Sequence, residues 1–119
     1  MKANASDLAN TNSNLNNKVN ASDITYFTKI RYGVKWFSTS ENKTWVNIAL
    51  ADFGFPNSVL ANYPCVVALP QMDPNDSANI NADVQVMCAK MTTDRKNIIL
   101  LLNRAFSNGL IFAVWFIVD

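Results

Sequence analysis

The segment from Leu110 to Val118, LIFAVWFIV, constrains the fold most, because every one of its residues is apolar. Successive side chains of a β-strand point to opposite faces of the sheet, so this segment presents apolar side chains on both faces. A strand in a small antiparallel sandwich normally has one face in water. The second face therefore needs a cover. We expect another copy of the chain to cover it, with residues 98–102 as well as Ile111, Trp115 and Ile117 in the interface. The alternative is a strand at the centre of a deeper monomeric core.

Alternation of apolar and polar residues predicts strands through most of the chain after residue 25. The expected strands span residues 28–36, 45–51, 65–69, 80–91, 98–104 and 110–118. The predicted fold class is therefore all-β, a small antiparallel β-sandwich of about six strands.

Turn residues predict how these strands connect. The polar run STSENKT should join the first two strands as a hairpin. The Asn108-Gly109 pair is typical of a tight type I′ turn, so the last three strands should form a C-terminal meander. Pro70 should end the third strand, and residues 52–64 should form an irregular connection with one helical turn at 57–61.

The first 24 residues differ in composition, because they are rich in Asn, Ser and Thr and contain no aromatic residue. Leu8, Asn12, Leu15 and Val19 fall at i, i+4, i+7 and i+11, which is one face of a helix. The words KANASDL and KVNASDI recur sixteen residues apart, a period that places them on nearly opposite sides of a continuous helix. We predict a short capped helical or coiled-coil neck over 1–24, where copies associate, and a β-sandwich head domain over 25–119. An extended or disordered polar leader is the alternative.

Charge and composition argue against several functional classes. The net charge is +1, with ten basic and nine acidic residues, so we predict no nucleic-acid partner. The chain has no histidine, which removes the commonest general base and metal ligand, so we predict neither an enzyme nor a cofactor. The apolar runs are shorter than a membrane-spanning helix, so no membrane insertion is predicted. Cys65 and Cys88 lie in apolar stretches and are expected to be buried free thiols, with a disulfide as the alternative.

One tryptophan is a candidate ligand contact. A flat ring beside amide and charged groups suits a sugar, and Trp45 begins a strand next to the polar turn that contains Asn42 and Lys43. Trp36 and Trp115 lie inside strand patterns and are expected to be buried instead. The sequence therefore places the predicted ligand site at the start of the second strand.

A polar loop supplies the other candidate ligand residues. Asp73, Asn75 and Asp76, in the run DPNDS, carry oxygens that could contact a ligand or Ca²⁺, although this composition is also ordinary turn chemistry. No metal site is predicted there.

The repeat K-x-N-A-S-D-[LI], followed by a compact all-β domain that ends on a hydrophobic strand, resembles the distal end of a bacteriophage tail fibre or receptor-binding protein. The resemblance covers the first 24 residues and the layout of the rest. It implies a homotrimer, made in the bacterial host cytoplasm and carried at the fibre tip of the virion, whose heads bind a cell-surface polysaccharide or protein of the host. In a coiled coil, Leu and Val at these seam positions favour an assembly of two helices, which departs from the homotrimer that the resemblance implies. The alternative is a structural trimerisation or capping domain of a fibre or bacterial trimeric adhesin, without its own ligand.

Overall fold

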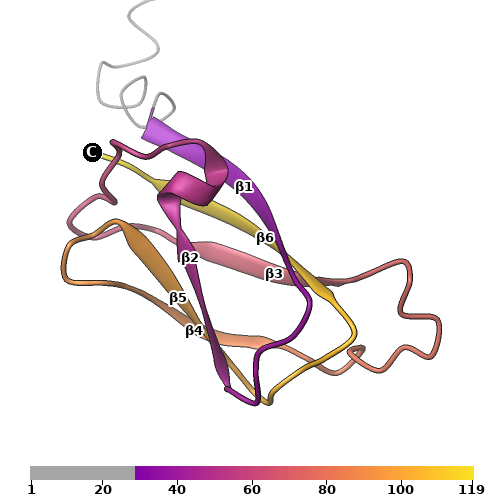
Figure 1. Cartoon of the computed structure of the whole chain (residues 1–119). Coiled ribbons are helices and arrows are strands. Elements are labelled where there is room, and N and C mark those ends of the chain that lie inside the picture. Colours follow the sequence, from indigo (N-terminus) through magenta and orange to yellow (C-terminus); the bar gives the residue numbers. More distant parts are fainter. Residues whose placement is uncertain (1–28) are drawn as a thin grey trace, which may run out of the picture.

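Two three-stranded antiparallel sheets pack face to face in the computed structural model, which describes residues 29–119 (Figure 1). Sheet A has the order β1-β6-β3 and sheet B the order β2-β5-β4. The elements are β1 (Ile30–Phe37), β2 (Trp45–Ala49), the 3₁₀ turn η1 (Leu50–Phe53), β3 (Val67–Met72), β4 (Val86–Met91), β5 (Asn97–Leu102) and β6 (Leu110–Ile117). The predicted all-β sandwich of six strands is confirmed. The predicted neck over residues 1–24 lies outside the described residues.

The core lies between the two sheets. The central strands β6 and β5 contribute most of it, because alternate residues of each point inward. The largest fully buried side chains include Phe112, Val114 and Phe116 of β6, Ile98 and Leu100 of β5, Ile48 of β2, and Leu50 and Leu60 of the connections. Each such side chain contributes about 1.5–3 kcal/mol by its removal from water.

The strand pairing differs from the predicted hairpins. β1 pairs with β6 and β2 pairs with β5, so the expected hairpin between the first two strands is wrong. Of the predicted meander, the β4–β5 pair is confirmed, whereas β5 and β6 lie in different sheets. The two most apolar strands thus become the centres of opposite sheets, where each packs against the other across the core. Adjacent pairing would have left them side by side in one sheet.

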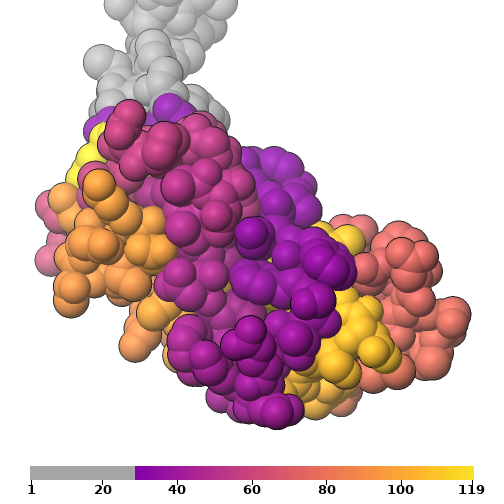
Figure 2. Space-filling model, in the orientation of Figure 1, coloured from indigo at the N-terminus to yellow at the C-terminus, as the bar shows by residue number. Residues whose placement is uncertain are grey.

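Three local predictions are also wrong. β3 continues through Pro70, which an edge strand tolerates because no neighbour needs its missing N–H. β4 begins at Val86 rather than at residue 80, because the Asp76 carboxylate accepts the N–H groups of Ile80 and Asn81 and fixes a turn there. The helical turn spans Leu50–Phe53 and not 57–61. The connection between β3 and β4 projects from the sandwich (Figures 1 and 2).

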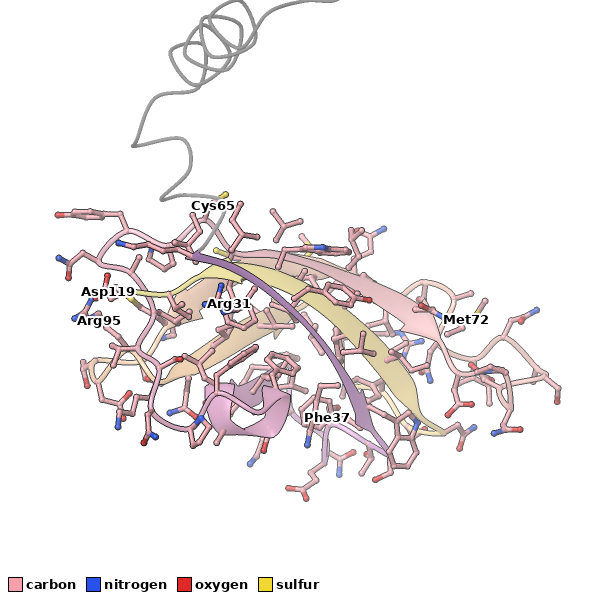
Figure 3. All side chains as sticks on the ribbon, turned by 90° about the horizontal axis from the view of Figure 1, so that it is seen from above. Arg31, Phe37, Cys65, Met72, Arg95 and Asp119 are labelled. Atoms are coloured by element: carbon pink, nitrogen blue, oxygen red, sulfur yellow. The ribbon has the colours of Figure 1, made fainter. Side chains whose placement is uncertain are left out.

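Both cysteines are free and exposed, so the expectation of buried thiols is wrong. Cys88 points outward because the pairing of β4 with β5 shifts register between Val86 and Cys88. Cys65 precedes β3 and lies on the side of sheet A opposite Arg31 (Figure 3). Within residues 29–119, none of the helical segments has the length and apolarity to cross a membrane.

Candidate functional site

The outer face of sheet B carries an aromatic ring beside polar groups. Trp45, the first residue of β2, is 39 % exposed. Leu101 of β5 pairs with Trp45, and the next row of the sheet brings Asn47 of β2 and Lys90 of β4 to either side of Ile99. The outer face of sheet B therefore presents an indole ring, an amide and an ammonium group together.

A tight turn positions the polar residues in front of Trp45. The N–H of Ser40 donates to the Phe106 carbonyl at 3.0 Å, and the N–H of Phe106 donates to the buried Ser40 Oγ at 2.9 Å. The turn closes where the Lys43 N–H donates to the Ser40 carbonyl at 3.0 Å, with Glu41 and Asn42 at φ 55° and 62°. This backbone holds the Lys43 ammonium 4.9 Å from the centre of the Trp45 ring, a cation–π contact.

Two open hollows adjoin the Trp45 ring. One, of about 260 Å³, is lined by Trp45, Lys90, Ile99 and Leu101. The other, of about 170 Å³, is lined by residues of the turn, including Glu41 and Lys43, and by Asn47. Both are smaller than the ~300–1,000 Å³ of enclosed small-molecule pockets. The arrangement suits a ring that lies on the surface better than a ligand that is engulfed.

A hydrogen-bonded pair of asparagine amides extends the polar part of this surface. The Asn47 Nδ2 donates to the Asn97 Oδ1 at 3.1 Å, across the paired strands β2 and β5. This bond fixes the orientation of the Asn47 amide, so its oxygen faces away from Asn97 as an acceptor. The sequence predicted Trp45, Asn42 and Lys43, and the structure brings Trp45 and Lys43 into contact.

Lys90, Asn47 and Leu101 were missed by the sequence prediction. Alternation along β2 does place Asn47 on the same face as Trp45, so that neighbour could have been found. The others depend on the register of β5 and on the β4 bulge, which short-range patterns do not specify.

The acidic loop lies elsewhere. The Asp73 carboxylate accepts the Asn75 N–H at 2.9 Å and the Trp36 Nε1–H at 2.6 Å, and Trp36 lies on the outer face of sheet A. These two bonds, the backbone one first, hold the pKa of Asp73 below its ordinary value. Asp76 is buried and accepts backbone N–H groups, while Asn75 is exposed. Asp73, Asn75 and Asp76 thus support the loop and are not gathered with Trp45.

The outer face of sheet A holds the predicted interface residues of the head domain. Ile111 and Ile117 are half-buried there. Residues 98–102 do not share this face, contrary to expectation, because they lie in β5 of the other sheet, whose inward side chains are buried in the core. The expectation that Trp36 and Trp115 are buried is wrong, since they are 53 % and 38 % exposed on the outer face of sheet A. The predicted seam residues Leu8, Asn12, Leu15 and Val19 lie outside the described residues.

Metal binding finds no support in the described part of the chain, where no three Cys, Asp or Glu side chains gather closely enough to hold an ion. No family model, curated protein or solved structure matches this chain.

Proposed function

We propose that this chain is the recognition head of an oligomeric fibre-tip protein, of the bacteriophage type that its N-terminal repeat resembles, and that Trp45 stacks on a sugar ring of a bacterial surface polysaccharide. The observation that carries the proposal is the exposed Trp45 ring, which borders two hollows, with the Lys43 ammonium over one face of the ring and with Asn47 and Lys90 in the lining of the hollows. The apolar face of a sugar ring packs on such an indole, and its hydroxyl groups bond to the polar rim.

The charges at this surface favour an acidic sugar. Lys43 and Lys90 both border the hollows, and Glu41 lies 4.0 Å from the Lys43 ammonium, where it offsets only one of the two cations. A uronic acid would place its carboxylate beside Lys90 while its ring covers Trp45. A single site of this size binds weakly, and several copies on one fibre raise the effective affinity by about 10²–10⁴.

The test is binding to a polyuronate, with dextran as the neutral comparison, by the full chain and by the variant Trp45→Ala. We expect the wild type to bind the polyuronate and the variant to lose at least about tenfold in affinity, equal to ~1.4 kcal/mol. Ile80→Ala is the control, because Ile80 is a 46 % exposed apolar residue in the connection between β3 and β4 and lines neither hollow at Trp45. Equal binding by wild type and Trp45→Ala would remove Trp45 from the proposal.

A structural role without a ligand is the second candidate, because exposed apolar side chains lie on all three strands of sheet A. On that account the domain caps or joins copies of a fibre. An oligomeric wild-type chain that binds neither acidic nor neutral polysaccharide would favour it.

A further inference from the structure

The outer face of sheet A is apolar on all three strands. Apart from the Tyr32 hydroxyl, the outward-facing rows of paired residues contain one polar side chain, that of Gln71 near the end of β3. The members of this surface, which we call the apolar face, are Ile30, Tyr32, Val34 and Trp36 of β1, Ile111, Ala113, Trp115 and Ile117 of β6, and Val67 and Leu69 of β3. Six of them, including Tyr32, Val34 and Leu69, are between 43 % and 56 % exposed.

The register of β1 turns its charged side away from this surface. Lys35 lies 3.5 Å from Asp52 of η1, and the Arg31 guanidinium lies 5.7 Å from the centre of the Phe55 ring. Figure 3 shows Arg31 on the side of β1 toward η1. A slip of one residue would exchange the two faces, yet all eight residues of β1 keep this pairing with β6. The strand thus places its apolar side in solvent, the reverse of what a monomeric sandwich requires.

We propose that the apolar face is the contact surface between two copies of this chain. Its side chains expose on the order of 800 Å², which matches the ~800 Å² per partner of a standard stable interface. The largest apolar patch of an ordinary monomer is about 300–600 Å². The available area is therefore what a second protein surface of equal size needs.

The arrangement of side chains on the apolar face is complementary to a second copy of the same face. The Tyr32 and Trp115 rings, 5.0 Å apart between centres, stand at one side of a middle row that contains Ala113, and Trp36 stands at the other side. The middle row consists of the aliphatic residues Val34, Ala113 and Leu69, with aromatic side chains on both sides of it. A second copy offers the same alternation of aromatic and aliphatic rows, so the two surfaces can pack in the way that sheets pack in a sandwich.

Charge argues against other occupants. None of the side chains of the apolar face is a cation for anionic lipid or a fixed charge for a charged peptide, and the Asp73 carboxylate, which accepts the Trp36 indole N–H, lies at one end of the face. The first 24 residues of this chain lack an alternating apolar run, with Leu8, Leu15 and Val19 four to seven positions apart, so they match the pattern of a covering strand poorly. A second copy is uncharged over the same area and is always present. This inference deepens the assembly part of the proposed function and is independent of the sugar site on sheet B.

The experiment measures the mass of the full chain in solution by sedimentation velocity. We expect a multiple of the 13.2 kDa chain for the wild type and 13.2 kDa for the double variant Val34→Glu/Leu69→Glu, which places two carboxylates in the middle row of the apolar face. Met87→Glu is the matched control, since Met87 is 64 % exposed on β4 of the other sheet, and it should keep the wild-type mass. Circular dichroism checks that each variant is folded.

Tryptophan fluorescence of the unmutated apolar face tests the proposal even if the double variant does not fold. In a Trp45→Phe background the remaining tryptophans, Trp36 and Trp115, both lie on the apolar face. Acrylamide should quench their fluorescence weakly in the assembly and more strongly on dilution. Quenching that does not change while the mass falls would overturn the proposal.

Other outcomes overturn it directly. One is a wild-type chain that stays at 13.2 kDa at about 100 µM. Another is a folded double variant that keeps the wild-type mass. The third is a monomeric chain that binds phosphatidylcholine vesicles in a flotation assay. Failure of the sugar proposal looks different, because it would leave the mass of the wild-type assembly unchanged. Loss of assembly, in turn, would leave the sugar site intact, so a monomeric Val34→Glu/Leu69→Glu variant should still bind a single polyuronate fragment as the wild type does.

Discussion

Gly33, on the inner side of β1, has no room for a side chain. A Cβ at this position would lie 2.3 Å from carbon atoms of the Phe53 ring, which stacks on Phe116 at 5.6 Å. Because that ring is held from both sides, Gly33→Ala should force it out of place and lower the free energy of unfolding by about 1–3 kcal/mol. Urea denaturation of the two proteins measures the difference.

The double variant Gly33→Ala/Phe53→Ala tests whether the ring is the cause. If the clash explains the loss, Gly33→Ala should cost little in the Phe53→Ala background, so the two changes will not be additive. Additive losses would show that Gly33 matters for a reason other than its contact with the Phe53 ring.

At the level of elements, the connection from β5 to β6 decides which sheet the last strand joins. Asn108 and Gly109 have φ values of 65° and 88°, as their sequence predicts, but the buried Asn81 amide donates to the carbonyls of Ser107 and Gly109, and the Gly109 N–H donates to Ser38. These bonds tie the turn to segments far away in the sequence. A turn that would otherwise close a hairpin leads the chain to the opposite sheet instead.

Asn81→Ala should therefore destabilise the domain. It removes both donors and leaves the carbonyls of Ser107 and Gly109 without them, at an expected cost of about 1–3 kcal/mol in the free energy of unfolding. Asn57→Ala, an exposed asparagine in the connection before β3, is the control and should change stability by less than about 0.5 kcal/mol. Thermal unfolding followed by circular dichroism compares them, and equal melting temperatures for the two variants would contradict this role.

The elements also show what sequence alone could predict. Alternation identified most of the strands and the fold class, because period two is a local property of a half-buried strand. It placed Trp45 at an exposed strand start for the same reason. Pairing was not predictable, because whether β1 joins β2 or β6 depends on contacts between distant segments. The alternation in β1 was seen, but it does not say which of its two faces meets the core.

For the whole molecule, carboxylates with bonding partners link stability to pH. The side-chain bond from Arg104 holds the pKa of Asp83 below its ordinary value, and the Thr92 hydroxyl and then the Lys96 N–H do the same for Asp94. The Asn75 N–H and the Trp36 indole lower the pKa of Asp73. All three groups therefore favour the ionised form when the chain is folded.

Acid should weaken the folded domain through these three carboxylates. A folded-state pKa below the unfolded value of about 3.9 means that the unfolded chain binds more protons between the two values, so stability rises with pH in that window. We expect the full contribution above about pH 5, where no histidine titrates, and its loss as the pH falls through the lowered values. Urea denaturation from pH 7 to pH 3 measures it, at one protein concentration because any association of copies would also stabilise the fold. Asp83→Asn should flatten the acid limb, and a domain whose stability stays constant to pH 3 would contradict the prediction.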